Sequence, residues 1–444
     1  MEKITVIGGG LAGSLVAIYF AKKGFDVALF ERRPDMRRTD IAAGRSINLA
    51  LSNRGLRALE KVGLDKEILK EAIPMRGRMM HSVEGELAFQ PYGKAGEAIY
   101  SVSRGNLNIQ LLKLADEHEN ITIHFEHKCT HVDYDNNKAT FINAEGKEVT
   151  VDTGRVIGSD GAYAATRGVL EKTDRFDYSQ AYLKHGYKEL TIPATADGNF
   201  AMDANSLHIW PRGQYMMIAL PNPDKSFTCT LFFPFEGAKS FETIDTTEKL
   251  QSFFKEQFND AVGMMPTLNQ DYFENPTGSL VTVRCYPWVK GDKLALLGDA
   301  AHAVVPFYGQ GMNCAFEDCV ILDECMDKYL PDWSKVFDEY QKERKPNADA
   351  IADLALQNFV EMRDLVGDEA FLHKKHVEHE LSEKYPQDFI SQYELTTFTH
   401  KPYSYALQQG AKNDNLLAEI INNGWEDKID DQAFMQQLFT KHLS

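Results

Sequence analysis

The first 31 residues constrain the fold most, because they read as one compact strand–helix–strand unit. The apolar run KITVIG ends in three glycines, LAGSLVAIYFAKKG has helical apolar spacing and a stop glycine, and DVALFE is a second strand. A helical crossover between two such strands makes them parallel neighbours in one sheet. We therefore expect an α/β protein that begins with a Rossmann-like sheet.

The glycines between the first strand and the helix fit the pattern GxGxxG through Gly8, Gly10 and Gly13. Such glycines allow a tight turn, a close approach of bare backbone to a pyrophosphate, and close helix packing. Glu31 ends the second strand, where a carboxylate accepts hydrogen bonds from a ribose and repels a 2′-phosphate. A glycine-rich turn without a ligand is the alternative, but the register of strand, helix and acid favours FAD or NAD. The expected cofactor contacts are Gly8, Gly10, Leu11, Ala12, Gly13 and Glu31.

A later loop, GDAAHAVVPFYGQGMN (298–313), follows the strand-like run KLALL. Asp299 could accept a hydrogen bond from a ribityl hydroxyl at the end of that strand. A helix starting near Gly309 would direct its backbone N–H groups into the crevice, where they would stabilise the negative charge of a reduced flavin. A plain strand-to-helix corner is the alternative. If the loop does hold FAD, the contacts are Asp299, Gly309, Gly311, Met312 and Asn313.

A third segment, VIGSDGAYAATRGVL, places Asp160 after another apolar strand. The order of the three segments, GxGxxG early, DG in the middle and GD late, resembles the class A flavoprotein hydroxylases, the family with the 4-hydroxybenzoate hydroxylase fold. The resemblance implies that Asp160 contributes to cofactor binding. One departure from the family pattern is Ala164, which stands where a hydroxyl residue is usual and removes a potential cap or cofactor contact.

The expected architecture is a Rossmann-like FAD-binding domain interleaved with an antiparallel-sheet substrate domain and followed by a helical C-terminal region. Alternating β-branched and aromatic residues, as in YMMIAL and FTCTLFFPF, predict the second sheet, and helical spacing begins at about Pro346. The expected FAD-binding domain comprises residues 1–75, 98–177 and 276–345. The expected sheet domain comprises 76–97 and 178–275, and the helical region that covers the substrate site comprises 346–444.

Longer stretches are similar to the branch of this family that hydroxylates L-kynurenine. They include MRGRMMHSVEGE, LHIWPRGQYMMIALPNPDKSFTCTLFFPFE and NFVEMRD. The resemblance implies a step of tryptophan catabolism with tightly bound, non-covalent FAD, NADPH as a transient co-substrate and O2 as the oxidant. No metal and no protein nucleophile are needed for such chemistry.

The same resemblance implies roles for individual residues. Arg78 would pair with the substrate carboxylate, and Tyr92, Asn358 and Tyr403 would complete the clamp through hydrogen bonds. Arg104 would lie on the FAD side and Arg45 near the pyrophosphate or the nicotinamide donor. The residues that would line the flavin face where oxygen reacts are Pro306, Phe307 and Tyr308.

Each role has a structural alternative: a surface arginine, a core tyrosine, a polar helix position, a salt bridge or plain packing. We expect a structural imidazole at His302, and a solvated face for His373, His376 and His379. Arg32, Arg33, Arg37 and Arg38 are candidates for the NADPH phosphates, or only solvate a loop. Rival functions are hydroxylation of another aromatic acid, an oxidase that makes hydrogen peroxide, or a non-enzymatic FAD-holding redox sensor.

The overall charge and the cysteines limit the partners and the compartment. A formal net charge of -17 argues against nucleic acid and anionic membranes as partners. No run approaches the roughly 18 apolar residues that span a bilayer. The six cysteines are scattered without a CxxC pair, which favours a reducing compartment. We therefore expect a cytoplasmic protein without a membrane anchor.

Overall fold

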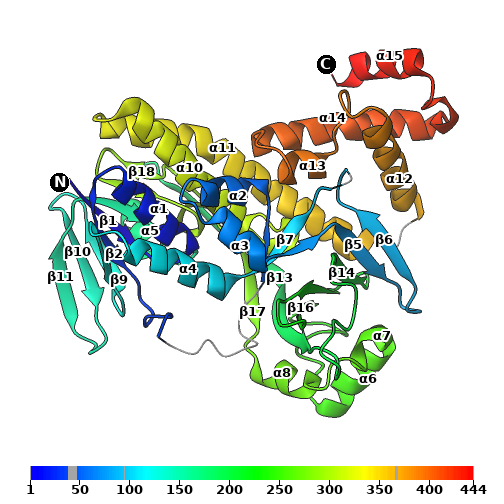
Figure 1. Cartoon of the computed structure of the whole chain (residues 1–444), viewed down its shortest axis with the longest axis horizontal. Coiled ribbons are helices and arrows are strands. Elements are labelled where there is room, and N and C mark those ends of the chain that lie inside the picture. Colours follow the sequence, from blue (N-terminus) through cyan, green and yellow to red (C-terminus); the bar gives the residue numbers. More distant parts are fainter. Residues whose placement is uncertain (1, 39–47, 95, 366–368, 444) are drawn as a thin grey trace. The chain divides into compact units, whose positions relative to one another are not determined.

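The computed structural model describes residues 2–38, 48–94, 96–365 and 369–443. These residues form two compact units, each assembled from three stretches of the chain (Figure 1). Unit 1 comprises Met1–Ile73, Tyr100–Leu183 and Ser279–Ala352, and unit 2 comprises Pro74–Ile99, Lys184–Gly278 and Asp353–Ser444. The C-terminal helices belong to unit 2 in this division, and a separate helical region from residue 346 stays a prediction.

Unit 1 is built on a six-stranded sheet in the order β18-β19-β12-β1-β2-β8. Strands β19, β12, β1, β2 and β8 run parallel, and only β18 pairs antiparallel with its neighbour. The strands are β1 (Lys3–Ile7), β2 (Asp26–Phe30), β8 (Ile121–His124), β12 (Arg155–Gly158), β18 (Val289–Lys290) and β19 (Leu294–Leu296). The parallel pairing of β1 with β2 confirms the crossover expected from the first 31 residues.

Helix α1 (Leu11–Lys22) connects β1 to β2, and its residues from Gly13 to Ala21 are all buried. A helix that is apolar on all sides packs inside a domain. The other helices of unit 1 include α2 (Asn53–Glu60), α3 (Asp65–Glu71), α4 (Arg104–Asp116), α5 (Ala165–Leu170), α9 (Asp299–His302), the 3-10 turn η1 (Pro306–Tyr308) and α10 (Gly311–Tyr329). Smaller sheets contain β3 (Asn48–Leu51), β7 (Ile99–Ser103), β9 (Lys128–Asp133), β10 (Lys138–Ile142) and β11 (Glu148–Asp152).

Most of a seven-stranded sheet with the order β17-β13-β16-β15-β14-β5-β6 belongs to unit 2, whereas residues 177–183 of β13 and 279–286 of β17 are counted in unit 1. The strands are β5 (Gly77–His81), β6 (Leu87–Pro91), β13 (Asp177–Ile192), β14 (Ser206–Pro211), β15 (Met216–Pro221), β16 (Phe227–Pro234) and β17 (Gly278–Tyr286), and β4 (Ile73–Met75) precedes them. The expected antiparallel pairing holds from β13 to β14 and between β5 and β6. Strands β14 and β5 pair parallel instead, because they come from separate passes of the chain and no hairpin connects them.

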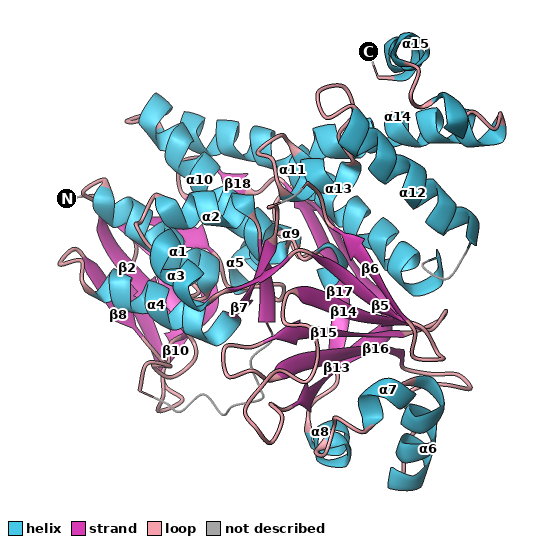
Figure 2. Ribbon diagram, turned by 45° about the vertical axis from the view of Figure 1, so that its right-hand side comes forward, coloured by secondary structure: helices cyan, strands magenta, loops and turns pink. Residues whose placement is uncertain are grey.

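Three helices pack on the sheet of unit 2: α6 (Thr247–Gln257), α7 (Asn259–Val262) and α8 (Leu268–Glu274). Figure 2 shows them along one side of β13 and β16. Their apolar side chains, such as Leu250, Phe254 and Leu268, are buried in one cluster with Trp210 and Phe233 of the strands. One face of the sheet is therefore covered.

The C-terminal part of the chain is helical, as the spacing predicts. Helix α11 (Trp333–Val360) contains Pro346 inside it, so helical structure begins 13 residues before the expected start. A π-turn, η2 (Glu361–Leu365), follows, and then α12 (Glu369–Lys384), α13 (Gln392–Thr397), α14 (Tyr403–Asn422), the short turn η3 (Glu426–Lys428) and α15 (Gln432–His442). Side chains of α12, α14 and α15 share one apolar cluster. Among the residues that the structure describes, no helix has both the length and the apolar character needed to cross a membrane.

A chain of polar contacts fixes strand β5 in unit 2. The His81 Nδ1 atom lies 2.6 Å from Asp260 Oδ2, and the His81 Nε2 atom lies 2.8 Å from His208 Nδ1. Trp210 Nε1 donates to both oxygens of Asp260 at 3.0 Å. Burial raises the pKa of Asp260, but hydrogen bonds from His81 and Trp210 outweigh it and hold that pKa below its usual range.

The lowered pKa of Asp260 makes this contact sensitive to acid. A carboxyl with a depressed folded-state pKa stabilises the fold above its unfolded value of 3.8, and this contribution is lost as the pH falls through the folded value. We expect Asp260→Asn to lower the free energy of unfolding by about 1–3 kcal/mol at neutral pH, with a smaller difference at about pH 3. Urea unfolding of both proteins measures this, and a difference that does not change with pH would contradict it.

Candidate active site

The predicted cofactor motifs meet at one edge of the sheet in unit 1. Gly8 follows β1, Glu31 follows β2, Asp160 follows β12 and Asp299 follows β19, so all four stand at the carboxyl ends of parallel strands. Backbone hydrogen bonds join these ends: Gly8 N donates to Phe30 O, and Leu297 N donates to Gly158 O, both at 2.8 Å. Open α/β sheets bind their ligands at this edge.

The three glycines of the first motif meet different surroundings. A Cβ atom on Gly8 would lie 2.3 Å from Ser159 O, and one on Gly13 would lie 1.8 Å from Gly8 O. Gly8 also has φ +110°, which side chains rarely adopt. The protein itself therefore requires these two glycines. A Cβ atom on Gly10 would meet no atom within 4 Å, so Gly10 leaves open space beside the backbone, as a pyrophosphate requires.

Glu31 lies against this glycine loop. It is buried, its Oε2 accepts a hydrogen bond from Gly9 N at 2.9 Å, and its Oε1 accepts two from Arg33 at 2.8 Å. The first turn of α1 begins at Leu11 and Ala12 and has neither a side-chain cap nor an acidic residue. The carboxylate and the helix N-terminus thus stand where a ribose and a phosphate would meet them.

The Asp160 carboxylate caps helix α5. It accepts hydrogen bonds from Ala165 N at 2.7 Å, Thr166 N at 3.1 Å and Thr166 Oγ1 at 2.5 Å. Ala164 occupies the N-cap position without a side-chain cap. Ala164 has no side chain that could cap the helix, and Asp160, four residues earlier, supplies the cap instead. The predicted contact of Asp160 with the cofactor stays a prediction.

We expect Asp160→Ala to lower the free energy of unfolding by about 1–2 kcal/mol, because it leaves the first N–H groups of α5 without their acceptor. Urea unfolding measures the loss, and Asp174→Ala, which removes an exposed acid just beyond α5, serves as the control. Equal losses in the two variants would contradict the capping role.

Asp299 carries the charge of the GD loop. Its side chain is exposed, yet its pKa is raised because the surrounding protein disfavours the charge, while Arg104 and His302 lower that pKa. Arg104 is the exposed first residue of α4, and its expected location on the cofactor side stays a prediction. Arg45 lies outside the described residues.

Asn313 fixes the start of α10. Its Oδ1 accepts a hydrogen bond from Ser52 N at 3.0 Å, and its Nδ2 donates to Ala50 O at 2.8 Å and to Gly309 O at 2.9 Å. The side chain of Asn313 therefore makes its hydrogen bonds to backbone atoms, and these bonds fix the loop that leads into α10. The first turn of α10, which includes Gly311 and Met312, has neither a side-chain cap nor an acidic residue.

The loop before α10 forms the turn η1. Pro306 is exposed, Phe307 and Tyr308 are buried, and Gly309 follows with φ +66°. A left-handed backbone of this kind favours glycine. The proposed location of these residues at the flavin face stays a prediction.

In unit 2, Arg78 lies among aromatic and acidic side chains. Its guanidinium carbon lies 5.6 Å from the ring centre of Tyr92 and 5.2 Å from that of Tyr393. The two tyrosine rings are stacked, with centres 4.9 Å apart. The Arg78 Nη1 atom lies 3.8 Å from Glu361 Oε1, and the side chain of Arg78 is only 13% exposed. Burial raises the pKa of Tyr92, and the charge of Arg78 opposes that shift.

The other two expected clamp residues are buried. Asn358, near the end of α11, donates from Nδ2 to Met362 Sδ at 3.3 Å. Tyr403 is fully buried at the first position of α14, and the ring that stacks on Tyr92 belongs to Tyr393. Sequence reasoning missed both Tyr393 and Glu361. Glu361 could have been found, because it lies three residues after Asn358 at helical spacing.

The residues of unit 1 fit FAD. Gly10 leaves room for a pyrophosphate, Glu31 reaches the glycine loop, and the N-termini of α1 and α10 present uncapped N–H groups. The described residues also include one possible metal-ligand group, His302, Cys314 and Asp318, which lies in a buried ion-pair network.

Comparison with known proteins identifies the family. The sequence profile of a family described as "FAD binding domain" matches residues 1–355. The kynurenine 3-monooxygenase of Myxococcus xanthus is 51% identical over 421 residues, which cover 94% of this chain and 90% of that protein. The kynurenine 3-monooxygenase of Dictyostelium discoideum is 48% identical over 458 residues, which cover 100% and 98%.

Solved structures agree on the fold. The tetrameric form of 2-methyl-3-hydroxypyridine-5-carboxylic acid oxygenase matches with a TM-score of 0.67 at 19% identity, over 84% of this chain and 95% of that one. Pseudomonas aeruginosa PqsL in complex with 2-aminobenzoylacetate matches with a TM-score of 0.65 at 21% identity, over 81% and 99%. The chain therefore belongs to the kynurenine 3-monooxygenase family, whose members have the FAD-binding fold of the class A flavoprotein hydroxylases.

Proposed function

We propose that this chain is an FAD-dependent monooxygenase that converts L-kynurenine to 3-hydroxykynurenine with NADPH and O2. The observation that carries the proposal is the arrangement around Arg78, where Glu361 stands 3.8 Å away and two stacked tyrosines contact the guanidinium. Kynurenine is an amino acid with an aromatic ring. It therefore presents a carboxylate, an ammonium group and an apolar plane, for which this cluster offers a cation, an anion and two rings.

Each residue of the cluster has a role in substrate binding. Arg78 pairs with the carboxylate, which a guanidinium can hold with two parallel hydrogen bonds. Glu361, which also lies 3.7 Å from Lys375 Nζ, attracts the ammonium group once the substrate carboxylate pairs with Arg78. The Tyr92 hydroxyl and the Asn358 amide, both in buried residues, donate or accept the remaining hydrogen bonds of the substrate. The stacked rings of Tyr92 and Tyr393 hold the Arg78 guanidinium in a fixed orientation. Tyr403 stays a further candidate.

The chemistry requires electrophilic oxygen, because the ring amino group of kynurenine makes the ortho carbon electron-rich. When FAD is bound and reduced by NADPH, it supplies that oxygen from O2. The glycine loop, Glu31 and Asp299 would hold FAD, and the N–H groups at the start of α10 would stabilise negative charge on the reduced cofactor. Pro306, Phe307 and Tyr308 exclude water from the place of transfer.

NADPH is the proposed electron donor. Of the candidate arginines, Arg37 already pairs with Asp35 and Asp116, and Arg33 pairs with Glu31. Arg38 also pairs with Asp35, at 3.4 Å, but its side chain is 86% exposed, so it is the most accessible of these three arginines for a phosphate of NADPH. We also propose the cytoplasm as the location, because all six cysteines are free thiols, as is usual in a reducing compartment.

The test is NADPH oxidation by the FAD-loaded protein with L-kynurenine and, separately, with kynuramine, which lacks the carboxylate. We expect strong stimulation by L-kynurenine and formation of a hydroxylated product, and little stimulation by kynuramine. Equal stimulation by both compounds would remove Arg78 from substrate recognition. If neither compound stimulated oxidation, the proposed substrate would be wrong.

A further inference from the structure

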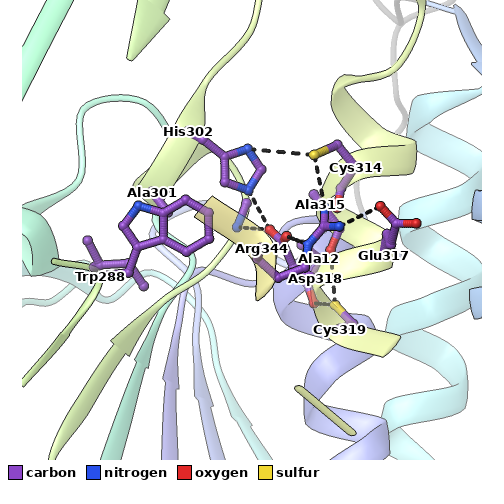
Figure 3. A network of polar contacts seen from close by, with 12 residues as sticks. Ala12, Trp288, Ala301, His302, Cys314, Ala315, Glu317, Asp318, Cys319 and Arg344 are labelled. Atoms are coloured by element: carbon purple, nitrogen blue, oxygen red, sulfur yellow. Dashed lines mark hydrogen bonds and ion pairs between the residues drawn. The ribbon is translucent and has the colours of Figure 1, made fainter. Parts of the chain in front are cut away.

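A buried network of charged side chains lies behind the GD loop in unit 1 (Figure 3). It connects helices α2, α9, α10 and α11, and every member is at most 7% exposed. Its members are Arg54, His302, Glu317, Asp318 and Arg344. Buried charges are costly unless they are paired, so a network of this size calls for an explanation.

Asp318 is the centre of the network and has no exposed surface. Its Oδ2 accepts a hydrogen bond from Gly298 N at 3.0 Å and lies 2.5 Å from His302 Nε2. Its Oδ1 accepts a hydrogen bond from Arg344 Nε at 2.7 Å. One carboxylate thus holds the backbone of the GD turn, the imidazole of α9 and the guanidinium of α11.

The remaining contacts balance the arginines. Glu317 pairs with Arg54 through one oxygen and lies 2.5 Å from Arg344 Nη1 through the other. The charges of the two arginines cancel those of Glu317 and Asp318. Protonation of His302 therefore gives the network a net positive charge. His302 Nε2 is bonded to Asp318, and its Nδ1 lies 3.9 Å from Cys314 Sγ.

The contacts favour the charged form of His302. Burial alone would lower the pKa of this imidazole, but Asp318 and Cys314 raise it well above its ordinary value. Burial likewise opposes the charge of Asp318, and His302 and Arg344 together hold its pKa low. The Trp288 ring lies 5.1 Å from the imidazole. Trp288 brings no charge, and the contacts of both ring nitrogens with Asp318 Oδ2 and Cys314 Sγ favour the protonated imidazole.

A metal ion is the rival occupant of this cluster, because ligand atoms of His302, Cys314 and Asp318 lie within 4.8 Å of one another. The Arg344 guanidinium argues against it. It donates to Asp318 Oδ1 and also, at 3.2 Å, to Cys314 Sγ. A fixed cation that shares two of the three ligands repels a metal ion.

The network stands directly behind two elements of the cofactor site. His302 is three residues after Asp299 in the short helix α9, and Asp318 holds the N–H of Gly298, the residue before Asp299. Asp318, Glu317 and Cys314 all belong to α10, whose N-terminus faces the cofactor in the proposed function. The network therefore fixes the GD turn and α10 to each other.

We propose that His302, held by Asp318 and Arg344, is a positioning residue for FAD. It locks the Gly298–Asp299 turn against α10 and adds a buried positive charge that favours the reduced, anionic flavin over the oxidised form. This inference rests on the proposed function in one respect, namely that FAD binds at Asp299 and α10.

The test is the variant His302→Gln, in which the amide retains a donor toward Asp318 but carries no charge. We expect the FAD-loaded variant to bind reduced FAD relative to oxidised FAD about tenfold less well, which lowers the two-electron midpoint potential by about 30 mV. The KM for L-kynurenine is expected to stay unchanged. The control is Cys325→Ala, a buried neutral change on α10 outside the network, which should leave the potential unchanged. An unchanged potential in His302→Gln, or equal shifts in both variants, would overturn the proposal.

Nitrogen NMR of histidine-labelled wild-type protein tests the charge even if the variant fails to fold. We expect both ring nitrogens of His302 to stay protonated from about pH 6 to about pH 8. Loss of the Nδ1 proton below about pH 7 would overturn the proposal. A protein that binds FAD and shows these signals but ignores kynurenine would refute the proposed substrate and leave this inference standing.

Discussion

Replacing Arg78 by lysine is expected to lower kcat/KM for L-kynurenine by about 100-fold, which corresponds to about 2.7 kcal/mol. Lysine retains the positive charge but loses the planar fork that holds a carboxylate with two hydrogen bonds and stacks on aromatic rings. Arg78 has both kinds of neighbour, since Glu361 lies 3.8 Å away and the rings of Tyr92 and Tyr393 lie within 5.6 Å. Steady-state NADPH oxidation measures the loss.

The matched control is Arg76→Lys. Arg76 precedes β5, two residues from Arg78, and its side chain is exposed. We expect kcat/KM and FAD content close to wild type in Arg76→Lys, and unchanged FAD content in Arg78→Lys. If both variants lost activity equally, or if Arg78→Lys kept wild-type kcat/KM, Arg78 would not be the carboxylate partner.

Replacing Gly10 by valine is expected to yield a folded protein that binds FAD at least about 100-fold more weakly, a loss of at least about 2.7 kcal/mol. A Cβ atom on Gly10 meets no protein atom within 4 Å, so the fold tolerates a side chain there. The same open space is where the cofactor must approach the backbone, and a side chain would keep the pyrophosphate away from the N-terminus of α1.

Two other glycines serve as comparisons for this prediction. Gly168, in helix α5, also has no atom within 4 Å of an added Cβ, and Gly168→Ala is expected to bind FAD like wild type. Gly13→Ala should fail to fold stably, because its Cβ would collide with Gly8 O at 1.8 Å. Titration of the apoprotein with FAD, followed by fluorescence, separates these cases. Wild-type affinity in Gly10→Val would place the cofactor elsewhere.

The parallel sheet, and the meeting of the three motifs at one of its edges, were predictable from the sequence because their signals are local. Residues 3–31 contain a strand, a buried helix and a second strand in direct succession, and the structure places β1, α1 and β2 there. Each of the three motifs follows a strand of the same sheet. Motifs that follow parallel strands meet at one edge however far apart they are in the chain.

The neighbours of Arg78 depend on tertiary packing and were only partly predictable. Tyr393 stacks on Tyr92 although about 300 residues separate them and no motif marks Tyr393. Likewise, the capping of α5 by Asp160 depends on the side-chain conformation of Asp160, which the DG pattern does not specify. Helical apolar spacing was recognised only from about Pro346, yet α11 begins at Trp333 and encloses that proline.

In the proposed reaction, one oxygen atom of O2 enters the aromatic ring of kynurenine. The most direct measurement is the mass of the product after the FAD-loaded protein has turned over L-kynurenine with NADPH under isotopically heavy O2. We expect 3-hydroxykynurenine with one heavy oxygen atom, formed in proportion to the NADPH consumed. NADPH consumption that yields only hydrogen peroxide, with unlabelled and unchanged kynurenine, would contradict it.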